Sequence, residues 1–207
     1  MAKQDVSAIT PESWHIPLSC GDITLRSAIA DLQRIGDEQA TIPLVVRLVE
    51  NPAFRLPGLE VFHGAADLRT HDSIHVLLGR GVLPKDEAFV IGFTMGSTKR
   101  MWLAEEASYT WIARHLYPGE YRFDEENVEV FRNAVRLGFV SDCLPLNLVS
   151  YQTHLDRSLR DVRRALGIEE DLLNAYYRIE MRRYPESPES QRLLDGWDET
   201  PRLMAIA

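Results

Sequence analysis

The sequence has few cysteines, no long apolar run and no apolar core of a signal peptide near its first residues. Its 207 residues include two cysteines, Cys20 and Cys143, which are far apart and form no CxxC pair. This argues against a disulfide scaffold and favours reduced thiols in a cytoplasm-like compartment. The longest uncharged apolar stretch covers only residues 88–95, whereas a membrane-spanning helix needs about 20 such residues. We therefore expect a cytoplasmic protein without a membrane span.

Positive charge is also scarce. The chain has 31 Asp and Glu against 23 Lys and Arg, so its net charge is -8. Because no basic field would collect a polyanion, nucleic-acid binding is excluded as a function class. Hydrophobic residues make up 45% and charged residues 26% of the chain, which is typical of a folded globular protein rather than a disordered one. The length is sufficient to bury a substantial core.

Apolar residues recur at spacings of three and four along most of the chain, which is the pattern of amphipathic helices. Together with flanking Gly, Pro and Asp residues, the pattern predicts helices over residues 24–35, 42–50, 64–78, 85–101, 101–116, 125–137, 148–166 and 169–184. A weak strand signal covers residues 59–63. We predict an all-α fold, a single bundle of about seven or eight helices. Its expected parts are an irregular segment at 1–22, a helical domain at 23–184 and a loosely held tail at 185–207.

Four potential metal ligands lie close together in the sequence: His71, Asp72, His75 and Glu87. Successive helical residues are about 100° apart, so His71 and His75 lie one turn from each other, and Asp72 shares their side of the helix. Glu87 follows a break at residues 79–84, and a short connection favours antiparallel neighbouring helices. Glu87 can then reach back to the two histidines. Two neutral imidazoles and two carboxylates would hold a divalent metal without net charge.

The four residues are also compatible with roles that need no such metal site. HxxxH pairs occur by chance in helical proteins, so His71 and Asp72 can be surface residues and His75 a hydrogen-bonded core histidine. His63 followed by His71 and Asp72 also suggests a metal-dependent phosphohydrolase, although no obvious later Asp completes that set. A third interpretation is a non-catalytic, lipid-binding scaffold in which four protein ligands close a structural metal site.

The stretch HDSIHVLLGRGVLPKDE over residues 71–87 has the form HDxxH, eleven residues, Glu. It resembles the signature of the Coq-four-type family of ubiquinone (coenzyme Q) biosynthesis proteins. The Leu-Leu-Gly after the second His and the stretch over residues 155–168 resemble that family too, so the likeness covers roughly residues 65–168. The resemblance implies an all-helical fold and a divalent metal, usually described as zinc, held by His71, Asp72, His75 and Glu87. Iron is the alternative, because two His and one carboxylate form the ligand set of non-haem iron oxygenases.

The resemblance also implies a function in ubiquinone assembly. The implied activity is the loss of the carboxyl group at ring carbon C1 of a prenylated benzoate precursor, coupled to hydroxylation of that carbon. The implied partners are a prenylated aromatic or isoprenoid lipid and other enzymes of quinone biosynthesis. The implied location is the cytoplasm, peripheral to the inner membrane, and a homodimer is left open.

A prenylated substrate needs an apolar groove. Ile91, Gly92, Met95 and Gly96 lie along one side of the helix after the break, and we expect them to bind the substrate; ordinary helix packing is the alternative.

Two further features have a functional and a structural interpretation. Glu105 and Glu106 can support the metal site or act as general bases, or they can be solvated surface acids. The helix over residues 171–184 has an apolar side with arginines nearby, which suits either a membrane surface or a packed helix.

Overall fold

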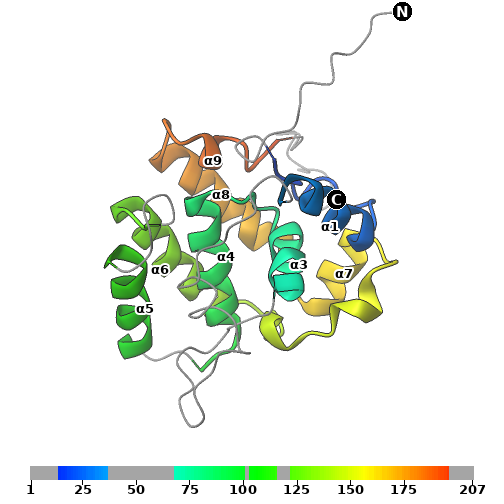
Figure 1. Ribbon diagram of the computed structural model, residues 1–207, viewed down its shortest axis with the longest axis horizontal. Coiled ribbons are helices and arrows are strands. Elements are labelled where there is room, and N and C mark those ends of the chain that lie inside the picture. The colour runs from blue at the N-terminus through cyan, green and yellow to red at the C-terminus, as the bar shows by residue number, and fades with distance from the viewer. Residues whose placement is uncertain (1–13, 37–67, 101–102, 116–121, 196–207) are drawn as a thin grey trace, which may run out of the picture.

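The computed structural model describes residues 14–36, 68–100, 103–115 and 122–195, and these residues form an all-α fold (Figure 1). Within them lie eight α-helices and two 3₁₀ turns. The helices are α1 (Leu25–Gly36), α3 (Leu68–Leu78), α4 (Pro84–Ser97), α5 (Leu103–His115), α6 (Glu125–Val140), α7 (Leu159–Leu166), α8 (Glu170–Arg183) and α9 (Pro188–Gln191). The predicted fold class is thus confirmed. The predicted helix over 42–50, the strand signal over 59–63 and His63 lie outside the described residues.

The helix that carries the HDxxH motif lies in the middle of the fold. Figure 1 shows α3 beside α4, with α6 and α5 on the side of α4, and with α1 and α7 on the side of α3. Contacts of α3 with α1, α4 and α7 agree with this view. Because neighbours surround α3, its residues from Ser73 to Leu78 are all buried, including His75. The surrounding elements therefore fix the position of the motif.

The backbones of α4 and α6 pack unusually close together. A Cβ atom added at Gly92 or Gly96 would lie less than 3.0 Å from a carbonyl oxygen of α6, and one added at Gly138 would lie equally close to the carbonyl oxygen of Phe93. The predicted substrate groove along Ile91, Gly92, Met95 and Gly96 is therefore wrong, because its glycines are covered by α6 and Met95 is buried. The helix predicted over residues 125–137 continues to Val140 as α6, and Gly138 within it allows the close approach to α4.

The predicted helix over residues 148–166 is only half correct. Its first part forms the 3₁₀ turns Leu146–Leu148 and Tyr151–His154, and α7 begins only at Leu159. Ser158 sets this start, because its side chain accepts a hydrogen bond from the backbone N–H of Asp161. Leu148 belongs to the apparent helical stripe, but its side chain is 78% exposed. The regular spacing of apolar residues before Ser158 was therefore coincidental.

Part of the predicted loose tail is packed against the domain. Residues 188–191 form α9, and Ser190, Arg192 and Leu193 are buried. The expectation of a loosely held tail is thus corrected for residues 185–195.

Of the two interpretations of the helix over residues 171–184, the structure favours the packed helix, because most of its apolar side is turned inward. Tyr176 of α8 is buried and Leu172 half-buried, while Ile179 remains exposed. No helix in the described part of the chain is long and apolar enough to span a membrane.

The close approach of α4 and α6 predicts whether Gly96→Ala raises or lowers the stability of the protein. On helix propensity alone, Gly96→Ala would stabilise the protein by about 1 kcal/mol. We expect it instead to lower the free energy of unfolding by about 1–3 kcal/mol, because the added methyl group forces the two backbones apart. Urea denaturation followed by circular dichroism measures this. A gain in stability would contradict the close packing of the two backbones.

Candidate metal centre

The turn between α3 and α4 brings the predicted ligands together. Gly79 ends α3 in the left-handed conformation (φ 68°), which glycine adopts without strain, and Pro84 begins α4. The backbone N–H of Arg80 also donates to the carbonyl of His75, which closes the turn tightly. The chain therefore reverses within a few residues, and Glu87 in the first turn of α4 lies opposite His71 and His75. The expectation that Glu87 reaches back to both histidines is confirmed.

Three of the four predicted ligands meet. The Nε2 atom of His71 lies 3.4 Å from Oε2 of Glu87, and Nε2 of His75 lies 3.2 Å from Oε1. One ligand atom from each of these three residues lies within 4.8 Å of the others, which is compatible with binding a single ion. Asp72 is not part of this group, although its negative charge still acts on His75. The structure thus favours a set of two His and one carboxylate over the predicted set of four.

The orientation of the His75 ring is fixed by a hydrogen bond on its far side. Nδ1 of His75 lies 2.6 Å from the carbonyl oxygen of Gly81. Since a carbonyl only accepts, Nδ1 donates, and in the neutral ring Nε2 carries the lone pair. A carbonyl partner of this kind is typical of metal-binding histidines, because it holds the other nitrogen toward the metal.

The two Nε2 atoms are placed to receive a cation. Among the described residues, Nε2 of His71 and Nε2 of His75 are buried without a hydrogen-bond partner. Both face the carboxylate of Glu87, although lone-pair nitrogens and carboxylate oxygens repel one another. A proton or a metal ion between them removes the repulsion, so these residues fit a divalent metal with nitrogen and oxygen ligands.

The group has a closed and an open side. The side chain of His75 is 2% exposed, whereas those of His71 and Glu87 are 20% and 25% exposed. His75 thus forms the floor of the site, and the other two ligands lie near its rim. Three protein ligands leave coordination positions for water or a substrate, as in catalytic metal sites, whereas structural sites have four protein ligands.

Without a metal, a proton takes the place of the ion. Burial opposes a charge on either imidazole and lowers the pKa of His71 to about 4. For His75 burial is again the largest single cause, but Glu87 together with the charges of Asp72 and Asp86 outweighs it and raises the pKa to about 9. The two histidines in turn hold the pKa of Glu87 below its usual value despite its burial. At pH 7 the metal-free site therefore has a charged His75, a charged Glu87 and a neutral His71.

Two further histidines in the described part of the chain lie outside this group. His115 is exposed and bonded to the carbonyl of Trp111, and His154 is half-buried beside Arg157. Glu105 and Glu106 lie on α5, and their side chains are outside the described residues. Sequence reasoning missed the carbonyl of Gly81, for which the Gly-Arg-Gly break was the available signal.

Comparisons of the chain with models of known protein families, with curated proteins and with solved structures found no match.

The ligand set can be tested residue by residue. We expect Glu87→Gln and His75→Ala to lower the affinity for a divalent metal by about 100-fold or more, because each removes one of three ligands. Asp72→Asn should lower it less than about tenfold, because Asp72 lies outside the ligand group and acts on His75 through its charge. Isothermal titration calorimetry with Zn²⁺ and Fe²⁺ measures both effects. Equal losses in Asp72→Asn and Glu87→Gln would restore the four-ligand set.

Metal uptake should release a proton. At pH 7 the proton on His75 must leave before Nε2 can bind a metal, whereas His71 is already neutral. We therefore expect about one proton released per metal bound at pH 7, and an affinity that rises with pH up to about 9. Calorimetry in buffers of different ionisation enthalpy counts the protons. Uptake without proton release at pH 7 would contradict this charge assignment.

Proposed function

We propose that the protein is a metal-dependent enzyme of ubiquinone biosynthesis that acts at ring carbon C1 of a prenylated benzoate precursor. The observation that carries the proposal is the convergence of His71, His75 and Glu87 at one point. These are residues of the same motif on which the family resemblance rests. They present two imidazoles and one carboxylate, which is the ligand set found in non-haem iron oxygenases.

The proposed reaction replaces the carboxyl group at C1 by a hydroxyl group. The bond between C1 and the carboxyl carbon breaks and carbon dioxide leaves. One atom of dioxygen forms the new C1–O bond, and the other leaves as water with two electrons and two protons from an external reductant. A bound dication would polarise the phenolate or carboxylate of the substrate, and iron would in addition supply redox chemistry that zinc lacks.

The chain contributes the position and the surroundings of this chemistry. His75, held by the Gly81 carbonyl on the buried side, fixes the inner end of the site. His71 and Glu87 leave the outer side accessible, where the substrate ring would enter. Burial of the group also excludes bulk water from the floor of the site, which strengthens its electrostatic interactions.

The proposed partners follow from the same function: a prenylated aromatic or isoprenoid lipid and other quinone-biosynthesis enzymes, met at the cytoplasmic surface of the inner membrane. Apolar side chains at the end of α6 and in the segment after it support a lipid contact. Phe139, Val140, Leu144 and Leu148 are each more than half exposed, which is unusual for large apolar residues so close in sequence.

A complementation experiment tests the function. We expect the wild-type chain to restore ubiquinone in a bacterial strain that lacks the C1 step. Glu87→Gln should restore it about 100-fold less or worse, because loss of a ligand removes several kcal/mol of transition-state stabilisation. Asp72→Asn is the matched control, with the same change of a carboxylate to an amide outside the ligand group. Quinone content is measured by chromatography, and iron and zinc by elemental analysis of the untagged protein. Full restoration by a folded Glu87→Gln variant would instead support a non-catalytic scaffold.

A further inference from the structure

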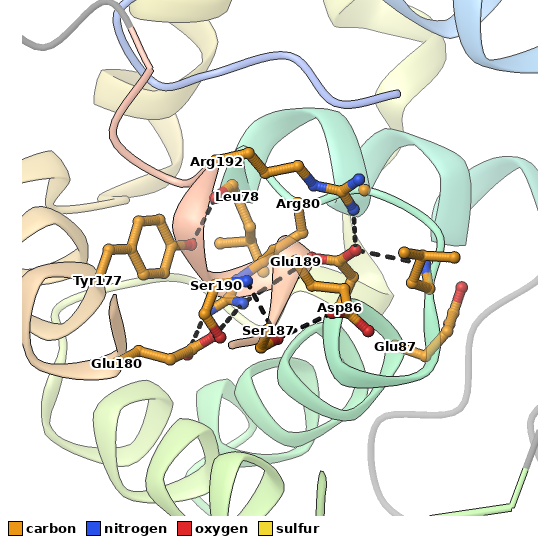
Figure 2. A network of polar contacts seen from close by, with 12 residues as sticks. Leu78, Arg80, Asp86, Glu87, Tyr177, Glu180, Ser187, Glu189, Ser190 and Arg192 are labelled. Carbon is orange, nitrogen blue, oxygen red and sulfur yellow. Dashed lines mark hydrogen bonds and ion pairs between the residues drawn. The ribbon is translucent and has the colours of Figure 1, made fainter. Parts of the chain in front are cut away.

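Four buried charged residues form a network beside Glu87 of the metal centre (Figure 2). Arg80 donates two hydrogen bonds to Glu180, of 2.8 and 2.7 Å, and Arg192 donates to Asp86. Nη1 of Arg80 also lies 3.9 Å from Oδ1 of Asp86, which joins the two pairs. Two positive and two negative charges balance, as buried charges require. The network connects the turn between α3 and α4 to α8 and α9.

Asp86 connects this network to Glu87. It precedes Glu87 in the first turn of α4, and its Oδ2 accepts a hydrogen bond of 3.3 Å from the backbone N–H of Leu83. This is the bond by which a carboxylate at the third position of a helix fixes the helix start. Arg192 binds the same oxygen. The place where α4 begins, and with it the position of Glu87, therefore depends on the pair of Asp86 and Arg192.

Arg192 also touches the residue that orients His75. A Cβ atom added at Gly81 would lie less than 3.0 Å from Nη2 of Arg192 and from the carbonyl oxygen of Trp14. The guanidinium group thus fills the space beside Gly81, whose carbonyl accepts the hydrogen bond from Nδ1 of His75. The side chain of Arg192 therefore contacts both Gly81, whose carbonyl orients His75, and Asp86, which precedes Glu87.

Arg192 is itself held in place. It follows α9 directly, and its backbone N–H donates to the carbonyl of Pro188. The hydroxyl group of Ser190 donates to Glu180 over 3.1 Å, which anchors α9 to α8. Arg80, the partner of Glu180, lies over the rings of Phe89 and Tyr177, at 3.9 and 4.4 Å from their centroids. The guanidinium of Arg192 thus projects from a firmly packed segment.

We infer that Arg192 is a positioning residue of the metal centre: it links the C-terminal segment at residues 188–193 to Gly81 and Asp86, and so holds His75 and Glu87 at the separation that one metal ion needs. This inference rests on the metal site of the proposed function. It gives the C-terminal segment a role in metal binding although none of its side chains is a ligand.

Two variants of Arg192 and one matched control test the inference. Arg192→Met removes the charge and the hydrogen bonds but keeps much of the side-chain length, and Arg192→Lys keeps the charge without the planar fork. Lys85→Met is the control, because Lys85 lies in the same first turn of α4 as Asp86 and Glu87 and is buried, as Arg192 is. It pairs with Glu126 (2.7 Å) and lies over the Tyr184 ring (4.4 Å to the centroid), and neither of these partners is a ligand.

The measurements separate positioning from general stability. The affinities for Zn²⁺ and Co²⁺ and the visible spectrum of bound Co²⁺ are recorded below the unfolding temperature of each metal-free variant. We expect Arg192→Met to weaken both metals by about 10–100-fold and to change the Co²⁺ spectrum, as loss of an outer partner does in other metal sites. Arg192→Lys should give an intermediate loss. Lys85→Met should lower the unfolding temperature but leave affinity and spectrum as in the wild type.

Each outcome is decisive. If the wild type and Arg192→Met bind both metals equally and with the same spectrum, the positioning role is refuted while the metal site stands. Equal losses in Arg192→Met and Lys85→Met also refute it. If Arg192→Met does not fold, the comparison of Arg192→Lys with Lys85→Met decides in the same way. If the wild type binds neither metal, the proposed function fails, and the inference fails with it.

Discussion

The hydrogen bond from His75 Nδ1 to the Gly81 carbonyl determines what the centre can bind. With Nδ1 committed as a donor, the neutral ring offers a lone pair at Nε2, toward Glu87. Without this acceptor the neutral ring could carry its proton on Nε2 and donate it to the Glu87 carboxylate, and no cation would be needed between them. Gly81 lies in the turn that reverses the chain between α3 and α4. The same turn therefore brings the ligands together and prepares one of them for a metal.

Burying charged side chains costs free energy unless each charge lies near one of opposite sign. A proton neutralises the ligand group, and a dication would leave one positive charge that the nearby negative charge of Asp72 offsets, while the adjacent network contains equal numbers of acidic and basic side chains. Side chains also satisfy the carbonyls at the C-terminal end of α3. Arg163 donates to the carbonyl of Leu77, and the Tyr177 hydroxyl donates to that of Leu78. With its terminal carbonyls bonded to side chains from α7 and α8, the motif helix has little freedom to rotate, and both imidazoles keep their direction.

Sequence patterns predicted what depends on neighbours in the chain. The start of α4 next to Pro84 and the shared side of His71 and His75 both follow from spacings of at most four residues. Which element packs against a given helix face, by contrast, depends on residues that are far apart in the sequence. The glycine spacing on α4 was visible, but not that α6 covers it. Arg192 lies 106 residues from Asp86, and a polar segment gives no apolar signal of its burial. The helical spacing placed Asp72 on the same side as the two histidines. Only the position of α4 in the structure shows that Glu87 joins the histidines and Asp72 does not.

The identity of the metal and the product of the proposed reaction are linked. Two His and one carboxylate with an open position occur both in catalytic zinc sites and in non-haem iron sites, so the ligand set accepts either ion. Hydroxylation at C1 requires electron transfer to dioxygen, which zinc does not support. In a zinc-loaded centre the chemistry would be limited to polarising the substrate, and loss of carbon dioxide would then leave hydrogen rather than hydroxyl at C1, without consumption of oxygen. The coupled reaction therefore implies iron at His71, His75 and Glu87, and decarboxylation alone is the chemistry compatible with zinc.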